Sequence, residues 1–353
     1  MLKEDIQMFI ERPEESKYTF NELAVQLFGY LYRENEAYQQ FCRRIGIGSR
    51  QVRTWKDIPA VSTDAFKNTF LSTVPGEDCE RIFMTSGTTS GKQGKHYHEN
   101  LDIYDFSARN SFQQFVSREK RPIAILFPDE EEMPNSSLAH YLTMLREYQG
   151  TKDSRHFFTR GGLKVQSFIQ WTKEYKDTPV IVLGASYSFV HLFDALEEIK
   201  QTLPLHKDSL IFDTGGFKNI SRSLEEEEFY EKLEQIFHVK RENMVNMYGM
   251  TELSTQYYTA IGKGQKHIKK NPHWIRFKVV DPVSGEEMPK GEAGLLIHVD
   301  LANINSVPAV QTSDLAVEHE TGFELLGRQA SAEPKGCSLS AKQWLEEHNH
   351  VNG

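Results

Sequence analysis

The sequence predicts an α/β protein with a mostly parallel sheet covered by helices, together with a smaller antiparallel or barrel-like part. Short apolar runs alternate with helical segments over the middle of the chain, an order typical of parallel strands joined by right-handed crossovers. From about residue 272 the pattern changes to strands separated by turns, which is typical of antiparallel pairing. At 353 residues, the chain is long for a single core and fits two compact parts better.

Short apolar runs mark the expected strands of the parallel sheet. The strands are expected at 122–127, 179–183, 209–212 and 244–247, and the helices between and around them at 138–149, 163–176, 188–201 and 223–237. In sheets of this kind, ligands bind beyond the carboxyl ends of the strands. Polar motifs that directly follow these strands are therefore candidates for a site.

The remaining segments complete the expected organisation. Thr19 and Glu22 form a capping-box pattern ahead of apolar residues at helical spacing, which predicts a helix over 19–43. Further strands are expected at 275–280, 294–299 and 322–326. The predicted division is a helical N-terminal region (1–75), an α/β core (76–270), an antiparallel or barrel-like part (271–328) and a C-terminal tail (329–353).

Composition narrows the class of function. The net charge of −9 argues against nucleic acid as a partner, because a polyphosphate backbone requires a broad basic surface. The three cysteines are too few and too scattered for a disulfide framework or a zinc site, which favours a reducing compartment. The N-terminus has no long apolar segment, and no apolar run approaches the length of a membrane span. We therefore expect a cytoplasmic protein with no membrane span.

The stretch 83–95 combines hydroxyl side chains, three glycines and two lysines in a pattern suited to phosphate. Glycines let backbone N–H groups approach an anion, hydroxyls add donors and lysines neutralise charge. A plain Gly/Ser/Thr loop is the alternative on composition alone. A Walker phosphate loop is excluded, because Gly87 and Gly91 are separated by three residues instead of four and Gln93 stands where the Mg²⁺-binding hydroxyl belongs. We expect the stretch to bind a nucleoside triphosphate.

Two motifs resemble those of the acyl-adenylate-forming enzymes, which include acyl-CoA synthetases, luciferases and peptide-synthetase adenylation domains. The run Thr85-Ser86-Gly87-Thr88-Thr89 resembles their Thr-Ser-Gly-Thr-Thr-Gly signature, with Ser90 inserted and the following Lys92 and Lys95 in an altered register. The run Tyr248-Gly249-Met250-Thr251-Glu252 resembles their Tyr-Gly-x-Thr-Glu motif. This resemblance implies that Tyr248 lies against adenine, that Thr251 contacts the α-phosphate and that Glu252 binds Mg²⁺, which prefers carboxylate oxygen. A helix start capped by Thr251 is the alternative.

Two further motifs follow the order of the same superfamily. Gly215 and Gly216 come after an apolar strand and match the glycine pair that lines the adenine pocket; a strand-to-helix turn is the alternative. Asp314 in Thr312-Ser313-Asp314, and Arg328 after Gly327, resemble the Thr-Gly-Asp and Gly-Arg motifs. The resemblance implies that Asp314 binds the ribose hydroxyls and that Arg328 lies near ribose and phosphate. A capped turn and a surface salt bridge are the respective alternatives.

The C-terminal part narrows the resemblance to one branch. Because 25 residues follow Arg328, we expect the chain to lack the mobile, lysine-bearing C-terminal domain of complete adenylate-forming enzymes. The short form, ending with Lys335-Gly336-Cys337-Ser338-Leu339, resembles the acyl-protein synthetases of the LuxE type, as do residues 135–141 and 184–187. The resemblance implies that a long-chain fatty acid is activated as acyl-AMP with ATP and Mg²⁺. The resemblance also implies that the acyl group then moves to Cys337 and on to a partner acyl reductase.

Individual residues acquire expected roles from this resemblance. Cys337 is the expected acyl acceptor, and a thiol is the most nucleophilic ordinary side chain near neutral pH. His140 and Gly184 are expected to contact the acyl substrate, although an ordinary buried histidine is an equally good interpretation of His140. Two alternative functions remain open: an acyl- or aryl-CoA ligase, and a non-catalytic acyl-carrier or scaffold subunit. The altered Lys92–Lys95 register is the best support for the scaffold alternative.

Overall fold

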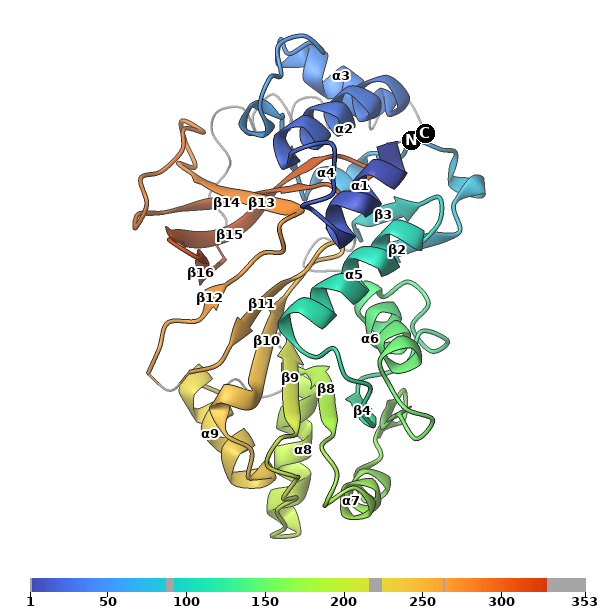
Figure 1. Cartoon of the computed structure of the whole chain (residues 1–353), viewed down its shortest axis with the longest axis vertical. Helices are drawn as coiled ribbons and strands as arrows, with labels where there is room; N and C mark the ends of the chain where they lie inside the picture. The colour runs from blue at the N-terminus through green and yellow to red at the C-terminus, as the bar shows by residue number, and fades with distance from the viewer. Residues whose placement is uncertain (1, 87–91, 216–223, 263, 329–353) are drawn as a thin grey trace. The chain divides into compact units, whose positions relative to one another are not determined.

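The computed structural model describes residues 2–86, 92–215, 224–262 and 264–328 (Figure 1), and it contains two compact units. The first unit comprises the described residues up to Ser111, the segment Met250–Gln256 and the described residues from Ile268 onward. The second unit comprises the described residues of Phe112–Gly249 and Tyr257–His267. The chain therefore passes from one unit to the other several times.

The second unit contains a six-stranded sheet with the strand order β11-β10-β9-β8-β4-β5. The strands are β4 (Ile123–Leu126), β5 (Arg155–His156), β8 (Ile181–Ala185), β9 (Leu210–Thr214), β10 (Met244–Tyr248) and β11 (Tyr257–Ala260). Neighbouring strands pair in parallel except β10 and β11, which are antiparallel. The four strands predicted from apolar runs are confirmed as parallel neighbours.

Helices of the second unit fill the crossovers between these strands. They are α6 (Ser137–Tyr148), α7 (Val165–Glu174), α8 (Ser186–Glu198) and α9 (Glu226–Phe237), and all four predicted helices are confirmed. A small hairpin of β6 (Phe158–Thr159) and β7 (Gly162–Leu163) precedes α7. Aromatic side chains from the last three helices form one core with the sheet: Phe168, Trp171, Phe189, Phe229 and Phe237. Burial of this apolar surface stabilises the unit.

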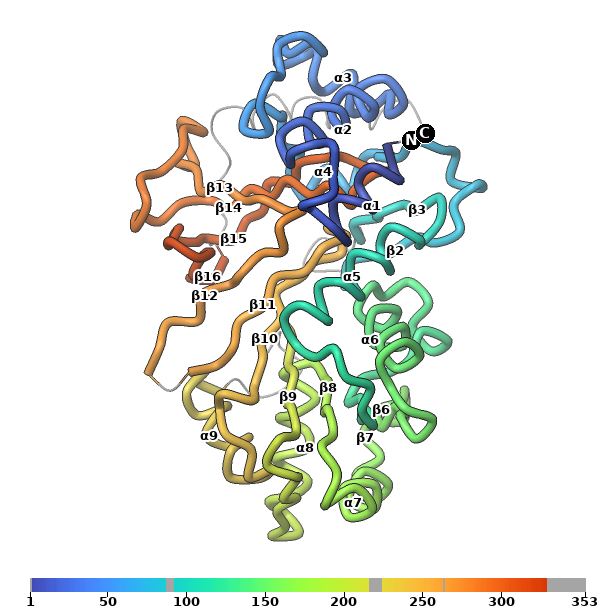
Figure 2. The backbone as a smooth tube through the Cα atoms, viewed as in Figure 1, coloured from blue at the N-terminus to red at the C-terminus, as the bar shows by residue number. Residues whose placement is uncertain are grey.

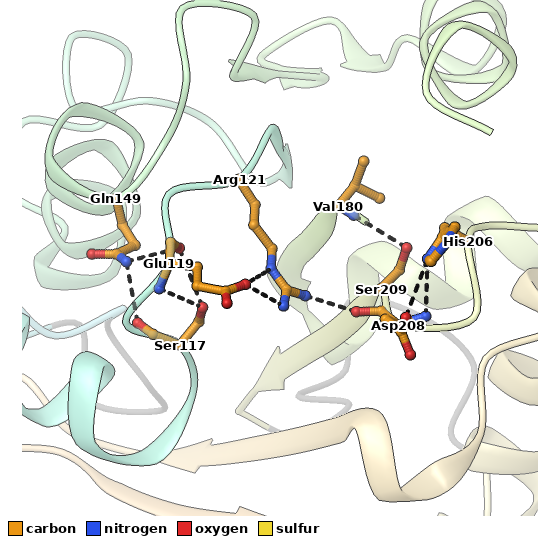
Figure 3. Close-up of polar contacts among 8 residues, drawn as sticks. All are labelled: Ser117, Glu119, Arg121, Gln149, Val180, His206, Asp208 and Ser209. Carbon is orange, nitrogen blue, oxygen red and sulfur yellow. Dashed lines mark hydrogen bonds and ion pairs between the residues drawn. The ribbon is translucent and has the colours of Figure 1, made fainter. Parts of the chain in front are cut away.

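Polar contacts close the amino-terminal edge of this sheet (Figure 3). Arg121, ahead of β4, donates from its guanidinium to the Glu119 carboxylate and to the backbone carbonyl of Asp208 at 2.7 Å. The Ser209 hydroxyl, ahead of β9, accepts from the backbone N–H of Val180 at 3.2 Å. The other residues drawn there are Ser117, Gln149 and His206. These bonds tie together the segments that precede β4, β8 and β9, at the end of the sheet opposite the carboxyl ends of the strands.

The first unit contains an antiparallel sheet in the order β12-β16-β15-β14-β13, with β1 paired in parallel to β15. The strands are β1 (Val61–Ser62), β12 (Ile268–Lys269), β13 (Ile275–Val280), β14 (Ala293–Asp300), β15 (Ala309–His319) and β16 (Gly322–Arg328). The antiparallel part predicted from residue 272 onward is confirmed. A separate antiparallel hairpin, β2 (Arg81–Met84) and β3 (Lys95–His98), carries the two ends of the predicted phosphate loop.

The helices before this hairpin differ from the prediction in one respect. They are α1 (Leu2–Glu11), α2 (Phe20–Glu34), α3 (Glu36–Arg44) and α4 (Ala65–Asn68), and α5 (Asp102–Phe115) follows the hairpin. The single helix predicted over 19–43 is wrong, because Asn35 ends α2 and caps α3 by accepting from the backbone N–H of Tyr38. The predicted capping box of Thr19 and Glu22 is confirmed. No described helix is both long and apolar enough to cross a membrane.

Segments distant in sequence come together in the first unit (Figure 2), whose N-terminal helices are blue and whose last described strands are orange to red. The side chain of Asn35 donates to the backbone carbonyl of Ser306 at 2.9 Å. Val61 and Ser62 of β1 pair with Val310 and Gln311 of β15. These contacts position α4, which follows β1, relative to the C-terminal strands.

Candidate functional site

Glu252 is the centre of a charged cluster in the first unit. It lies in the segment Met250–Gln256 and is only 5% exposed. Burial raises the pKa of its carboxyl to about 7. Its own backbone N–H and the charges of Arg328 and Lys67 act in the opposite direction, and the charge of Asp314 adds to the rise. Glu252 thus lies within electrostatic range of Asp314 and Arg328, which were predicted from separate motifs.

The strand pair β15 and β16 positions Asp314 and Arg328. The two residues are register partners, and Arg328 Nε donates to Asp314 Oδ1 at 3.1 Å. The Asp314 side chain is buried, whereas that of Arg328 is 67% exposed. The ion pair expected as the alternative for Arg328 is therefore present, with only its Arg328 side exposed. The ion pair keeps the positive charge of Arg328 close enough to lower the pKa of the Glu252 carboxyl.

Lys67 is a member of this cluster that the sequence analysis missed. It lies in the short helix α4, where its ammonium group forms an ion pair with Asp64 at 2.8 Å. Its charge also lowers the pKa of Glu252. Lys67 is placed there by the pairing of β1 with β15. No local motif could have identified it, since the pairing joins segments about 250 residues apart.

The two ends of the predicted phosphate loop form a closed stem. The backbone N–H of Thr85 donates to the carbonyl of Gly94 at 2.9 Å, and the N–H of Gly94 donates to the Thr85 hydroxyl at 2.8 Å. A Cβ at position 94 would meet the Thr85 methyl at 3.1 Å, a close contact that leaves little room for a side chain. Ser86 and Lys95 are exposed. The predicted loop residues Gly87, Thr88 and Thr89 lie outside the described residues.

His96 connects this hairpin to the segment that carries Glu252. Its Nδ1 donates to the backbone carbonyl of Thr251 at 2.8 Å, which requires the proton on Nδ1 because a carbonyl oxygen only accepts. Burial lowers the pKa of His96 to about 4, so the ring is neutral at physiological pH. Lys95 and His96 alternate on β3, the lysine exposed and the histidine buried. The loop stem and the Thr251–Glu252 motif are thereby fixed to each other.

The second unit holds the residues predicted for adenine at the ends of its strands. Gly215 follows β9 with φ +79°, a conformation that favours glycine. Tyr248 ends β10, and its ring meets that of Tyr257 edge-on at 5.9 Å between centroids. Gly249 follows directly and is exposed. Gly216, the second glycine of the predicted pair, lies outside the described residues.

Asp213 stabilises this end of the sheet. Its carboxylate accepts from the Ser186 hydroxyl at 2.9 Å, the Tyr230 hydroxyl at 3.0 Å and the Asn246 amide at 2.8 Å. These donors come from α8, α9 and β10, and Asp213 itself is 2% exposed. The sequence analysis did not select it, although it stands two residues before Gly215 in the same run. These three hydrogen bonds hold the end of β9 in place, directly before Gly215.

The residues predicted to contact the acyl substrate also lie in the second unit. His140 is in α6, 7% exposed, and its Nδ1 is 2.7 Å from the Glu130 carboxylate. Gly184 is inside β8, where a side chain would meet Leu126 and Phe189 at 3.0 and 3.1 Å. Gly184 therefore has a packing reason to be glycine, and the acyl-binding role of both residues stays a prediction.

The predicted acyl acceptor, Cys337, lies outside the described residues. Of the other two cysteines, Cys42 is fully buried and burial raises its pKa to about 12. Partial burial also raises the pKa of Cys79, and the negative charges of Asp78, Glu99 and Glu77 add to the rise. Because the thiolate is the nucleophile, neither described thiol is suited to capture an acyl group near neutral pH.

A model of the acyl-protein synthetase family, LuxE, matches residues 7–346. The chain belongs to this family. Among its relatives, the long-chain-fatty-acid–luciferin-component ligase of Vibrio harveyi is 24% identical over 345 residues, covering 94% of this chain and 89% of the relative. The ligase of the same name from Aliivibrio fischeri is 22% identical over 355 residues, covering 95% and 91%. The family membership predicted from the motifs is confirmed.

Solved structures of adenylate-forming ligases share the fold. A 2-hydroxyisobutyryl-CoA ligase in complex with 2-HIB-AMP and CoA has a TM-score of 0.64 at 14% identity, covering 87% of this chain and 69% of that one. ATP-bound MatB from Rhodopseudomonas palustris has a TM-score of 0.50 at 15% identity, covering 72% and 49%. At these identities the likeness shows the fold alone. It confirms the predicted fold class of the family.

Proposed function

We propose that this protein uses ATP to activate a long-chain fatty acid as an acyl-adenylate and then transfers the acyl group to its own Cys337. A partner acyl reductase would take the acyl group from there. Membership of the acyl-protein synthetase family and the ligase fold support acyl activation by a ligase. The observation that supports the chemistry most directly is the assembly of Glu252, Asp314, Arg328 and Lys67 beside a loop stem that His96 bonds to Thr251.

The residues of this assembly fit a magnesium-dependent nucleotide site. A buried carboxyl whose pKa is raised by burial gains most from a cation, since a bound dication restores the ionised form. Oxygen donors are also those that Mg²⁺ prefers. Glu252 would hold the ion, which supplies charge neutralisation on the phosphate oxygens. Within the described ranges no group of three or more His, Cys, Asp or Glu side chains could hold a metal ion by itself, so the phosphates and water would supply the other ligands.

The proposed chemistry has two balanced steps. In the first, a carboxylate oxygen of the fatty acid attacks the α-phosphorus of ATP, the bond to the β-phosphate oxygen breaks, and acyl-AMP and pyrophosphate form. In the second, the Cys337 thiolate attacks the acyl carbon, the bond to the phosphate oxygen breaks, and a thioester and AMP form; the thiol proton goes to solvent. Arg328 and Lys67 stabilise the negative charge that develops on the phosphates. The Asp314 carboxylate would accept hydrogen bonds from the ribose hydroxyls.

The first step is tested by fatty-acid-dependent exchange of labelled pyrophosphate into ATP. Glu252→Gln should lower the exchange rate by about 10²- to 10³-fold, the usual cost of removing a preorganised charge-stabilising group. Glu77→Gln, which removes a carboxylate from the same unit outside this cluster, is the matched control and should exchange at the wild-type rate. Wild-type exchange by folded Glu252→Gln would refute the role of Glu252.

The second step is tested with labelled fatty acid. Cys337→Ser should retain pyrophosphate exchange but lose the hydroxylamine-sensitive label on the protein. Cys79→Ser is the control and should keep both. Persistent labelling of Cys337→Ser would assign the acceptor to another residue. Formation of acyl-CoA at a comparable rate when CoA is added would favour the CoA-ligase alternative.

A further inference from the structure

The segment Met250–Gln256 has no helix or strand of its own to hold Glu252 in place. It connects β10 to β11 through turns and bends, and it belongs to the first unit although both strands belong to the second. Its backbone groups are nevertheless buried around Leu253, which is 1% exposed. Buried backbone N–H and C=O groups require partners. The hydrogen-bond partners of this backbone therefore determine the direction of the Glu252 side chain.

The turn that follows β14 supplies these partners from one asparagine. Asn303 Nδ2 donates to the backbone carbonyl of Glu252 at 2.9 Å, and Asn303 Oδ1 accepts from the backbone N–H of Ser254 at 2.9 Å. A single planar amide thus holds the backbone on both sides of Leu253. The two bonds also fix the orientation of the amide, because its oxygen faces a donor and its nitrogen faces an acceptor. Asn303 is 1% exposed.

Asp300 supports the same segment from the end of β14. Its Oδ2 accepts from the backbone N–H of Ser254 at 3.0 Å, and its Oδ1 accepts from the Thr255 hydroxyl at 2.7 Å. Oδ1 also accepts from the backbone N–H of Ala302 at 2.9 Å, which links it to the turn that carries Asn303. Asp300 is fully buried. The side chains of Asn303 and Asp300 therefore bind the backbone of Glu252 and Ser254 and the hydroxyl of Thr255.

We infer that Asn303, supported by Asp300, is the positioning residue that aims the Glu252 carboxyl at the bound metal and nucleotide. The inference rests on the proposed function of Glu252 and extends it to residues about 50 positions away. Asn303 acts through the backbone of Glu252 and contacts no reacting group. Outer partners that orient a metal-binding side chain typically contribute about 10- to 100-fold in metal affinity or activity.

The experiment compares two buried asparagines of the same turn. Asn303→Ala should raise the Mg²⁺ concentration needed for half-maximal pyrophosphate exchange by about tenfold or more. Asn305→Ala is the matched control: Asn305 is 6% exposed and donates to the Thr73 hydroxyl and the Glu99 carboxylate. It should leave the Mg²⁺ dependence at the wild-type value. Equal effects of the two variants would overturn the inference, since a general loss of packing would then suffice.

A double-mutant comparison separates this inference from the proposed function itself. If Asn303 acts through the Glu252 carboxyl, Asn303→Ala should reduce exchange no further in a Glu252→Gln background. A full multiplicative loss there would overturn the positioning role, while wild-type exchange by Glu252→Gln alone would refute the proposed function instead. If Asn303→Ala does not fold, Asn303→Asp has nearly the same volume, keeps the acceptor for the backbone N–H of Ser254 and removes the amide that donates to the carbonyls of Glu252 and Val307. Wild-type Mg²⁺ dependence of folded Asn303→Asp would then overturn the inference.

Discussion

The interior of the first unit contains His96, His298, Asp300 and Glu252, each at most 5% exposed. A hydrophobic core of the second unit consists instead of apolar side chains from its sheet and helices. Its buried carboxylate, Asp213, is bonded to neutral donors. An apolar interior stabilises through area removed from water, whereas a polar interior does so only while each group keeps its partner and its protonation state. The comparison teaches that the unit with the charged cluster also holds the buried acids and histidines whose pKa values are shifted furthest, so the pH dependence of stability should be carried mainly by that unit.

The largest expected effect concerns the apolar core of the second unit. Phe237 is fully buried against Phe168 and Phe189. Phe237→Ala should lower the free energy of unfolding by about 3–5 kcal/mol, through lost burial and the cavity left behind. Urea denaturation measures it. The control Ile199→Ala changes a side chain that is 45% exposed on the same unit and should cost at most about 0.5 kcal/mol. Similar losses in both variants would contradict the packing of this core.

The next effect is a pH dependence carried by the first unit. Burial lowers the pKa of His298 to about 3, whereas an unfolded histidine has a pKa of about 6.5. The unfolded chain therefore binds a proton that the folded chain does not, and stability present above pH 6.5 is lost as pH falls, by about 1.4 kcal/mol per pH unit. His96 acts with the same sign. Glu252 and Asp300 act with the opposite sign, because their folded pKa values, about 7 and about 6, are raised.

Replacing His298 measures its contribution to the pH dependence of the free energy of unfolding. Relative to wild type, His298→Leu should gain about 1.4 kcal/mol in free energy of unfolding for each pH unit between 6 and 4. Urea denaturation of both proteins at pH 7, 6, 5 and 4 provides the measurement. A difference between the two proteins that stays constant over this range would show that His298 is not buried in its neutral form.

The smallest effect concerns a single buried asparagine of the first unit. Asn35 caps α3 and donates to the carbonyl of Ser306. Asn35→Ala should cost about 1–3 kcal/mol, because it removes the cap and leaves a buried carbonyl without its donor. Thermal unfolding measures the loss. Asn243→Ala, which removes a bond to the Lys207 carbonyl at the surface of the second unit, is the comparison and should cost about 1 kcal/mol or less. A larger loss at Asn243 would reverse the contrast between the units.

The same contrast explains what the sequence could and could not predict. The strands and helices of the second unit were predicted because an apolar sheet with covering helices leaves a local pattern in the chain. The break at Asn35 was missed, since apolar spacing continues across it and the cap is a tertiary feature as much as a local one. Glu252, Asp314 and Arg328 were found through motifs. Lys67 and Asn303 were not, because their contacts with the site come from pairing and turns whose partners are distant in sequence.

The register of the β2–β3 hairpin has a consequence for how such loops evolve. Met84 pairs with Lys95, and the hydrogen bonds between the next two residues, Thr85 and Gly94, continue this pairing toward the loop. A slip of one residue in this register would turn Lys95 inward and His96 outward. The bonds between Thr85 and Gly94 hold the register, and they therefore preserve the hydrogen bond from His96 to Thr251 when the enclosed residues change. The sequence between Thr85 and Gly94 can therefore change while His96 keeps its hydrogen bond to Thr251. The proposed affinity of this loop for phosphate and its attachment to the rest of the unit are therefore free to change independently.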